Sequence, residues 1–278
     1  MLDAIGTAAA DGVDLLVFPE TFVPGYPVWA DFTHAAAFDD SRQKAAFGQY
    51  LDAAVDIGRG DLDTVTTVAA QLGIFVYLGV AERSPSGGSI YCSLVAIDPR
   101  HGIVSVHRKL KPTYGERLMW ADGDGHGLVV HDHLTTDDGV VRVGGLNCWE
   151  NWMPLARAAM WAQGPHVHVA TWPGSPGVAH DVSRFVAREG RVFVVSAGAI
   201  LRHEDVADDF AVLDELSTNG DRWLSGGSII VGPDGETLAV ADAHCETIVA
   251  ADIDLAAGRA ERQNFDPAGH YSRPDVLQ

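Results

Sequence analysis

The 278-residue sequence predicts an α/β fold in which two mixed β-sheets stack on each other and helices cover their outer faces. The main evidence is that helical and strand-like patterns alternate along most of the chain. Two hairpin patterns, across DPRHG at 98–102 and across PDG at 233–235, interrupt this alternation and add antiparallel strands. The sequence contains no internal repeat, low-complexity segment or linker, so we expect residues 1–278 to form a single domain.

The first part of the chain, up to residue 107, contains both helical and strand patterns. The apolar runs 13–18 and 74–81 are unbroken, which is typical of strands buried on both faces. Gly73 marks the break between a helical pattern and the second of these runs. We therefore expect helices at 2–10, 45–57 and 62–72, and strands at 13–18, 74–81, 89–97 and 103–107.

The second part of the chain continues the alternation. Residues 141–146 form an apolar strand pattern that turns at Asn147–Cys148 into a helix. Apolar residues at helical spacing predict this helix: Trp152, Leu155, Ala159 and Met160. We expect further strands at 166–172, 192–199, 226–231, 237–241 and 247–253, and a further helix at 181–190.

The composition argues against several classes of partner. The formal net charge is −19 at pH 7, whereas a protein that binds a phosphate backbone or an anionic membrane surface needs clustered Lys and Arg. We therefore expect an uncharged or cationic small molecule as the ligand, and neither a nucleic acid nor a membrane as a partner.

The sequence also carries signals about cellular location. It has no apolar run of membrane-spanning length, and its start lacks the basic and apolar regions of a signal peptide, which predicts a soluble, cytoplasmic protein. The three cysteines, Cys92, Cys148 and Cys245, show no CxxC spacing, so we expect neither a disulfide framework nor a thiolate zinc site. Free thiols of this kind suit a reducing compartment.

Three predicted strand ends carry Glu20, Lys109 and Cys148. Sheets of α/β proteins place their ligands at the carboxyl ends of strands, and Cys148 stands where a strand passes into a helix. Backbone amides at the start of that helix stabilise a thiolate and the anion that forms after its attack. Each residue also has a purely structural interpretation, since a free cysteine is usually buried and inert, and a loop Glu or Lys is usually solvated.

If these strand ends converge, they supply a nucleophile, a base and a cation. A thiol with a pKa of roughly 8.5 is mostly protonated at neutral pH, so its attack needs a base and a nearby positive charge. Glu20 is the candidate base. Lys109 is the candidate cation, and it also stabilises negative charge on the heteroatom bound to the attacked carbon. We expect no metal and no organic cofactor, because a covalent sulfur intermediate divides one difficult reaction into easier steps.

Three segments, FPETFVPGYP, HRKLKPTYGERLMW and CWENWMPLAR, closely resemble the catalytic signatures of the nitrilase (carbon–nitrogen hydrolase) superfamily, in that family's order. The resemblance is to nitrilases proper and extends from Asp14 through GHYSRPDV near the end of the chain. It implies that Glu20 is the general base, Lys109 the charge stabiliser and Cys148 the nucleophile. It also implies that Glu116 positions the substrate and hydrogen-bonds the lysine.

The resemblance has further implications for structure and activity. It implies an α-β-β-α sandwich that pairs into a dimer and often grows into spiral oligomers, so we expect a homodimer or a higher homo-oligomer. The implied activity is the hydrolysis of an organic nitrile to a carboxylic acid and ammonia. Members of the family usually have one more strand before the first helix, and nitrilases commonly continue beyond GHYSRPDV. The sequence alone leaves open whether this chain is trimmed or mis-started.

Other residues are candidates for substrate contact or metal binding. Aromatic side chains near the motifs are expected either to wall a substrate pocket or to lie in the core: Tyr26, Trp29, Tyr114, Trp149 and Trp172. His166 and His168 face the same side of a strand, as in some metal sites, but a third ligand at suitable spacing is missing. We interpret these two histidines as packing or supporting residues, and Cys92 and Cys245 as buried or incidental thiols.

Two other functions stay open at this point. An amidase or carbamoylase of the same superfamily would share the catalytic residues, although CWEN favours a nitrilase because the residues after the cysteine usually differ in amidases. A non-catalytic assembly or binding protein would have lost a catalytic residue, and none of the four is lost. Cyanide-converting relatives more often carry His where Asn151 stands, so the sequence favours an organic nitrile over cyanide as the substrate. The motifs do not distinguish aliphatic, aromatic and arylacetonitrile substrates.

Overall fold

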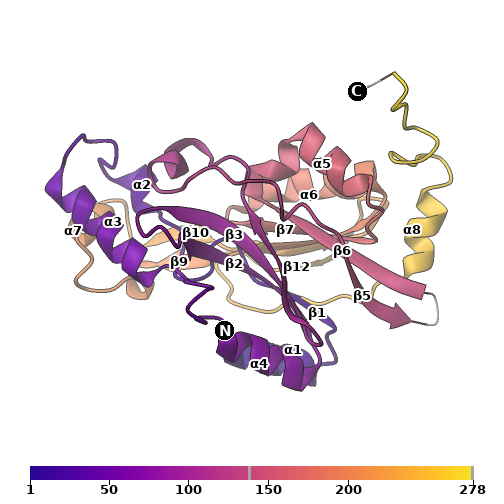
Figure 1. Cartoon of the computed structure of the whole chain (residues 1–278), viewed down its shortest axis with the longest axis horizontal. Coiled ribbons are helices and arrows are strands. Elements are labelled where there is room, and N and C mark those ends of the chain that lie inside the picture. The colour runs from indigo at the N-terminus through magenta and orange to yellow at the C-terminus, as the bar shows by residue number, and fades with distance from the viewer. Residues whose placement is uncertain (137–138, 277–278) are drawn as a thin grey trace.

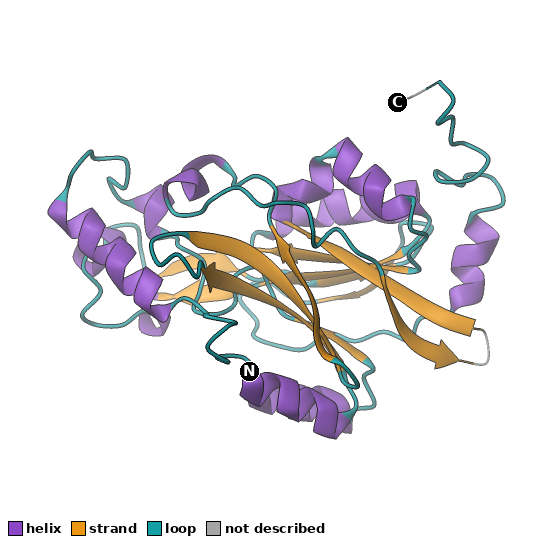
Figure 2. Cartoon of the chain, viewed as in Figure 1, coloured by secondary structure: helices purple, strands orange, loops and turns teal. Residues whose placement is uncertain are grey.

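The computed structural model of the protein describes residues 1–136 and 139–276 and shows stacked β-sheets between outer helices (Figure 1, Figure 2). The smaller of the two stacked sheets has its strands in chain order: β1 (Leu15–Val17), β2 (Phe75–Arg83), β3 (Ile90–Asp98) and β4 (Gly102–Arg108). β1 is parallel to β2, whereas β2, β3 and β4 form an antiparallel meander. The predicted hairpin between β3 and β4 is therefore confirmed.

The larger sheet has six strands in the order β12 (Thr237–Val240), β11 (Ile229–Val231), β8 (Phe193–Gly198), β7 (Val167–Trp172), β6 (Gly139–Asn147) and β5 (His131–Thr136). β6, β7 and β8 are parallel, and the outer strands are antiparallel to their neighbours. A separate pair consists of β9 (Ile200–Arg202) and β10 (Arg222–Ser225). Both large sheets are mixed, as the sequence predicted.

The two large sheets pack face to face through apolar side chains. These are Phe75, Tyr77, Leu94 and Ala96 from the smaller sheet and Val143, Val167, Val169 and Phe193 from the larger one. The Tyr77 hydroxyl also donates a hydrogen bond across the interface to the Val143 carbonyl, at 3.2 Å. A β-carbon at Gly145 of the larger sheet would lie 3.0 Å from the Leu94 side chain of the smaller sheet, so the absence of a side chain at this position allows the two sheets to approach closely.

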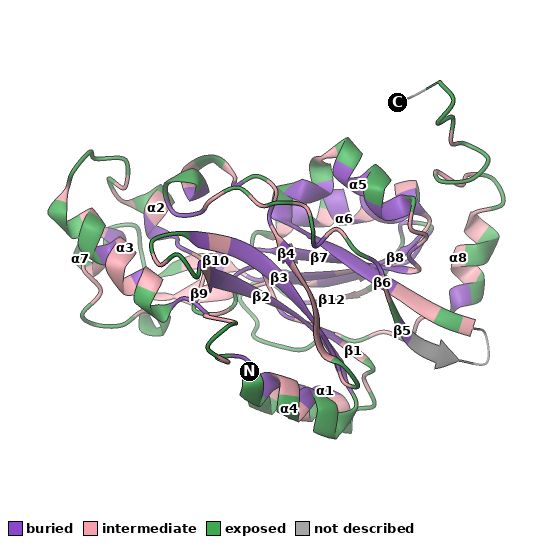
Figure 3. Ribbon diagram, in the orientation of Figure 1, coloured by how far each residue is buried: buried purple, intermediate pink, exposed green. Residues whose placement is uncertain are grey.

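Helices cover the outer face of each sheet (Figure 1). α1 (Leu2–Ala10) and α4 (Asp63–Leu72) bury their apolar side chains against the smaller sheet. α5 (Pro154–Trp161) and α6 (Pro176–Gly190) do the same on the larger sheet. Burial follows these layers, because the central strands are buried along most of their length and the helices mainly on one side (Figure 3). The predicted fold class, an α-β-β-α sandwich of two mixed sheets, is confirmed.

The chain has further helices besides these four. They are α2 (Trp29–Phe32), α3 (Ser41–Ala53), α7 (Leu213–Ser217), α8 (Leu255–Glu261), and the 3₁₀ helices η1 (Tyr114–Leu118), η2 (Cys148–Trp152) and η3 (His203–Asp205). α3 begins before its predicted start at 45, because the Asp40 carboxylate accepts hydrogen bonds from the backbone N–H groups of Arg42 and Gln43. Within residues 1–136 and 139–276, no helix has the length and apolar character needed to cross a membrane.

The strand predicted at 247–253 was wrong. The structure has no strand there, and the segment instead lines an open groove opposite β1. Ile253 packs against the apolar residues between the sheets. The apolar pattern of this segment therefore reflects side-chain burial, and it arises without the hydrogen-bonded ladder that defines a strand.

The helix predicted after Cys148 is divided into η2 and α5. Pro154 is the first residue of α5 and disfavours helical backbone at Met153, which is extended (φ −77°, ψ 109°). Because of this break, residues of η2 and α5 do not lie along one continuous helical face. The apolar spacing across 152–160 therefore does not identify the buried side of α5. Of the four apolar residues that predicted the helix, Met160 is buried, and Trp152, Leu155 and Ala159 are exposed.

Candidate active site

Cys148 lies where β6 ends and η2 begins, as predicted. The Glu150 carboxylate accepts a hydrogen bond from the Asn147 backbone N–H at 2.8 Å, and the Asn147 side chain bonds in return to the backbone of η2. This reciprocal pair fixes the turn on both sides of Cys148. The Cys148 side chain is buried beneath the surface, with 3% of its area exposed.

Glu20 follows β1 and is completely buried. Its backbone N–H donates to the Trp172 carbonyl at 3.3 Å, so the Glu20 loop joins the ends of β1 and β7. Gly79 on β2 makes room for this loop, because a β-carbon there would lie 2.0 Å from the Pro19 carbonyl oxygen. Gly79 lies inside an otherwise continuous apolar strand pattern, so its role in making room for the loop is not visible in the sequence.

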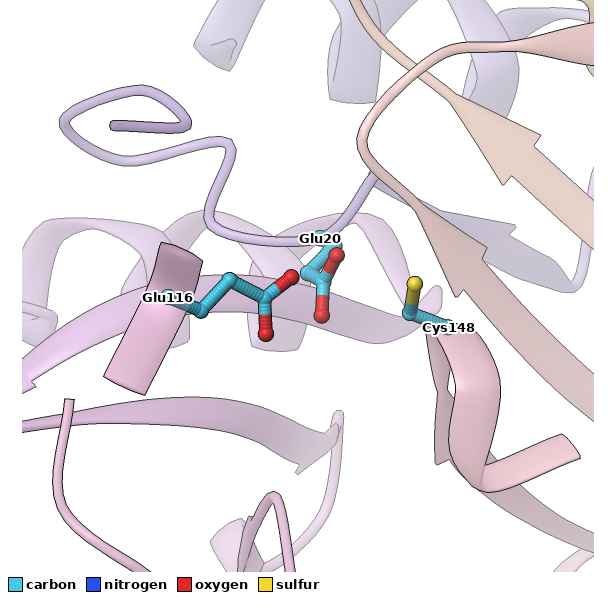
Figure 4. Close-up of side chains that lie close together, drawn as sticks. All are labelled: Glu20, Glu116 and Cys148. Atoms are coloured by element: carbon cyan, nitrogen blue, oxygen red, sulfur yellow. The ribbon is translucent and has the colours of Figure 1, made fainter. Parts of the chain in front are cut away.

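The ammonium of Lys109 joins two carboxylates. Lys109 Nζ donates to Glu20 Oε1 and to Glu116 Oε2, each at 2.7 Å, and all three side chains are buried. The Thr113 backbone N–H holds Glu116 Oε2 from another side, at 2.6 Å. Ligand-type atoms of Glu20, Glu116 and Cys148 all lie within 4.8 Å of one another, and Figure 4 shows these side chains together. The structure thus brings the four residues singled out by the motifs into one cluster.

Three residues of this region have left-handed backbone conformations that L-amino acids rarely adopt. Thr21 follows Glu20, Tyr114 begins η1 just before Glu116, and the third is Cys148 itself, with φ values of 42°, 44° and 48°. Each such residue costs about 1–2 kcal/mol when it is not glycine. Strain of this kind is typical of functional sites, where the surrounding structure holds the backbone in place.

Burial and charge together set the proton affinities of the cluster. Burial raises the pKa of Glu20 to about 7, against the opposing effect of the Lys109 ammonium. Burial also raises the pKa of Cys148 well above its ordinary value, and the charge of Glu20 adds to this increase. Burial by itself would lower the pKa of Lys109, but the negative charges around it raise this pKa well above its usual range. At neutral pH the cluster therefore holds a neutral thiol, a charged lysine and a carboxyl group able to exchange a proton.

Glu150 holds two of the segments that carry the cluster, a role that the motifs did not indicate. Its Oε2 accepts the Asn147 backbone N–H at 2.8 Å, its Oε1 accepts the Leu110 backbone N–H at 2.7 Å, and His107 Nε2 lies 2.9 Å away. Because Asn147 precedes the cysteine and Leu110 follows the lysine, one buried side chain ties both segments together. Leu110 is distant in sequence, so the spacing of the motif gave no signal for this contact.

Asn151 also stabilises the turn that contains Cys148. Its Nδ2 donates to the Cys148 carbonyl at 2.9 Å, and its Oδ1 lies 2.7 Å from His168 Nε2. Burial lowers the pKa of His168 to about 3, so this ring is neutral. His166 Nδ1 accepts a hydrogen bond from the Arg142 backbone N–H at 3.1 Å. The two histidines thus make separate contacts within the protein, in agreement with the interpretation as packing or supporting residues.

Two of the aromatic candidates lie near the charged cluster. The Tyr26 hydroxyl donates to Glu116 Oε1 at 3.0 Å, so Tyr26 contacts the cluster through a carboxylate. Trp172 is buried and belongs to the same group of packed apolar side chains as Cys148. Contact of both residues with the substrate remains a prediction. Tyr26 has a second role, because its hydrogen bond fixes the position of the Glu116 carboxylate.

The other aromatic candidates lie elsewhere. Trp29 packs edge-on against Tyr50 and Phe210, in the core around α2 and α3. Tyr114 and Trp149 are 85% and 48% exposed. In this structure their side chains are surface groups beside the motifs, whereas the reacting groups are buried.

Glu20, Glu116 and Cys148 are close enough to share a metal ion. The ammonium of Lys109 already lies between the two carboxylates, at 2.7 Å from each, and offsets part of their negative charge. The protein itself therefore supplies the positive charge that a cation would bring to this position. That the reaction needs no cofactor stays a prediction.

A groove of about 1100 Å³ lies between β1 and residues 245–253 and extends to Tyr26, whose hydroxyl contacts Glu116. Pro19 and Thr21 line it, but the four clustered side chains do not. The clustered side chains are therefore buried beside this groove and do not form its wall.

The two-sheet sandwich has a counterpart among solved structures. A crystal structure of a carbon–nitrogen hydrolase from Helicobacter pylori G27 has the same fold, with a TM-score of 0.72 and 19% sequence identity over 99% of this chain and 89% of that chain. A sequence model of the carbon–nitrogen hydrolase family matches residues 1–263, and the chain belongs to this family.

Proteins of similar sequence agree with this assignment. A nitrilase from Bradyrhizobium diazoefficiens is 36% identical over 277 residues, which cover 99% of this chain and 83% of the relative. A bifunctional nitrilase/nitrile hydratase from Nicotiana tabacum is 34% identical over 277 residues, which cover 98% of this chain and 77% of the relative. The family that the three motifs predicted is confirmed.

Proposed function

We propose that the protein is a nitrilase in which Cys148 is the nucleophile, Glu20 the proton acceptor and Lys109 the charge stabiliser, with Glu116 holding the lysine and the substrate. The observation that carries this proposal is the Lys109 ammonium, 2.7 Å from both carboxylates and beside a buried thiol. The similar proteins named nitrilase support the choice of a nitrile as the substrate. A nitrile is a small uncharged molecule, which suits a chain of net charge −19.

In the first step, the Cys148 proton passes to Glu20 as the sulfur attacks the nitrile carbon. One carbon–nitrogen π bond breaks, and the nitrogen then takes the proton from Glu20 to give a thioimidate. Negative charge develops on the nitrogen during this attack. An ammonium has three N–H donors, and the two glutamates take two of those of Lys109, which leaves one to stabilise that charge.

Two water molecules complete the reaction. The first adds to the thioimidate carbon while Glu20 accepts one of its protons and passes it to the nitrogen. As the carbonyl forms, the remaining hydroxyl proton passes to the nitrogen in the same way, the carbon–nitrogen bond breaks and ammonia leaves. The second, activated in the same way, attacks the resulting thioester, so that the carbon–sulfur bond breaks, the acid leaves and Cys148 regains its proton. A pKa of about 7 suits Glu20 for accepting and returning protons at neutral pH.

A panel of nitriles tests the proposal. Purified protein is incubated with aliphatic nitriles, aromatic nitriles and arylacetonitriles, and ammonia, acid and amide are measured together. We expect at least one class to give acid and ammonia in equal amounts. An amidase or carbamoylase would instead release ammonia from the matching amides and leave every nitrile intact, and this result would replace the nitrilase assignment.

We also propose that the protein forms a homodimer or a larger homo-oligomer. Large apolar side chains are exposed on η2, α5 and α6: Trp149, Trp152, Leu155, Val178 and Phe185. Exposed apolar patches of this kind mark contact sites between proteins. Light scattering across a concentration series should therefore give at least twice the mass of one 29.6 kDa chain.

A charge placed in this apolar patch should weaken the association. Leu155 is 84% exposed, so Leu155→Arg leaves the fold intact but buries a charge in any contact made there. Phe38→Arg is the matched control, because Phe38 is fully exposed on the loop before α3. A fully active wild-type monomer at every concentration would contradict the proposal.

A further inference from the structure

Cys92 contacts two members of the charged cluster, although no sequence pattern assigns it a role. It lies in β3 and is 1% exposed. Its Sγ lies 3.3 Å from Glu20 Oε1, in position to donate an S–H hydrogen bond. Its backbone carbonyl accepts the Lys109 backbone N–H at 2.7 Å. Cys92 thus fixes the strand end that carries the lysine and contacts the carboxylate directly.

The two oxygens of Glu20 have different surroundings. Oε1 accepts hydrogen bonds from Lys109 Nζ at 2.7 Å and from Cys92 Sγ at 3.3 Å. Oε2 is buried and has no hydrogen-bond partner among the residues that the structure describes. A buried carboxylate oxygen without a partner is costly, and a role in proton transfer is one reason for a protein to retain it. Oε2 is therefore the oxygen with lone pairs free to accept a proton.

We propose that Cys92 is a positioning residue, which donates to Glu20 Oε1 and so holds the carboxylate with Oε2 free to take the proton of Cys148. This inference rests on the proposed role of Glu20 as the base. Lys109 alone is a single anchor about which the carboxylate can rotate. A second donor on the same oxygen restricts that rotation and keeps the two oxygens in distinct roles.

A thiol suits this task in a buried site. Burial raises the pKa of Cys92 well above its ordinary value, so its sulfur keeps its proton and stays a donor. A protonated thiol is also a poor nucleophile. Cys92 can therefore lie beside the base without competing with Cys148 for the substrate.

The alternative is that Cys92 only fills space in the core, as buried cysteines often do. Packing alone predicts a change in stability and no change in how activity depends on pH. A hydrogen bond to the carboxylate predicts a shift in the pKa of Glu20, because the S–H donor favours the ionised form. The titratable groups that face Glu20 are Lys109, Glu116, Cys92, Cys148, Tyr26 and Tyr50.

The test compares Cys92→Ala and Cys92→Val, which lack a donor, with Cys92→Ser, which keeps one. For the wild type, the acid side of the kcat/KM profile should fall with a midpoint near the Glu20 pKa of about 7, because the base must be ionised. In the Ala and Val variants we expect this midpoint to rise by about 0.5–1 pH unit and kcat to fall about three- to tenfold at pH 7, as for the loss of one modest hydrogen bond to a carboxylate. The Ser variant should stay close to the wild type.

Two results would overturn the proposal: an unchanged midpoint in both donor-free variants, or a Ser variant that shifts as they do. Chemical unfolding of each variant separates this effect from a loss of stability, and Cys92→Val fills the space if Cys92→Ala does not fold. If the wild type cleaves amides and no nitrile, the profiles are measured on the amide, since the base is shared. A failed nitrilase assignment is therefore distinguishable from a failed role for Cys92.

Discussion

Cys148→Ala is expected to abolish the release of ammonia from nitriles, with a loss on the order of 10⁶-fold, as when the nucleophile of a covalent hydrolase is removed. The reason is that no other thiol in the cluster can form the thioimidate. Cys148 lies within 4.8 Å of both carboxylates, whereas the Cys92 sulfur is engaged with Glu20. Ammonia assays at high enzyme concentration measure the residual rate, and intact-protein mass spectrometry should show no substrate mass on the variant.

The other two cysteines serve as controls for this experiment. Cys245→Ala should retain the wild-type rate, because Cys245 is exposed and lines the groove that excludes the clustered residues. Cys92→Ala should keep part of the activity, since it removes a positioning contact and not the nucleophile. If Cys148→Ala still released ammonia at a comparable rate, the covalent mechanism would be wrong.

Glu20→Gln is expected to lower activity by about 10²–10⁴-fold or more, because glutamine keeps the shape but accepts no proton. Both the activation of the Cys148 thiol and the attack of water depend on that proton transfer. The pKa of Cys148 is raised by burial, so the thiol does not ionise by itself at neutral pH. Mass spectrometry after incubation with substrate should accordingly show little or no adduct.

Glu116→Gln should behave differently, because Glu116 binds the Lys109 ammonium and does not accept the Cys148 proton in the proposed mechanism. Its loss misplaces the ammonium and the substrate while the base stays intact, so the thiol can still attack. We expect a slow enzyme with substrate mass trapped on Cys148, detectable by the same mass spectrometry.

Glu82→Gln is the matched control for both variants. Glu82 is also buried and bound to a cation, the Arg108 guanidinium at 2.9 Å, but it lies outside the cluster. This change should lower stability and leave kcat near the wild-type value. Equal, mild losses in Glu20→Gln and Glu116→Gln, with no adduct in either, would show that neither glutamate has its proposed role.

Much of the fold was predictable because its signals are local. Unbroken apolar runs marked strands such as β2, and Gly73, with a left-handed φ of 71°, ends α4 where the pattern breaks. The errors arose where a local pattern has two possible structures. Residues 247–253 bury apolar side chains without strand pairing, and the turn at Pro154 moved the buried side of α5 away from Leu155.

The site was predictable to the extent that its residues lie in contiguous motifs. Each of Glu20, Lys109, Glu116 and Cys148 was named from its segment, and the structure brings them together. The supporting residues depend on contacts between distant segments. Cys92 meets Glu20 across 72 positions, and in the sequence it is one more apolar-looking residue of a strand. Only the three-dimensional arrangement distinguishes such a residue from core filling.

The left-handed backbone at Thr21, Tyr114 and Cys148 has a consequence for attempts to make this enzyme more heat-resistant. Glycine at such positions relieves about 1–2 kcal/mol of strain each, which makes them attractive targets for engineering. At Thr21 and Tyr114, however, the same change would loosen the turns that aim the two glutamates. Asp39 and His244 adopt the same conformation, with φ values of 62° and 63°, in segments that carry none of the four clustered residues. Glycine substitutions intended to raise thermal stability should therefore be made at those two surface turns, where a change in the backbone does not alter the alignment of the clustered side chains.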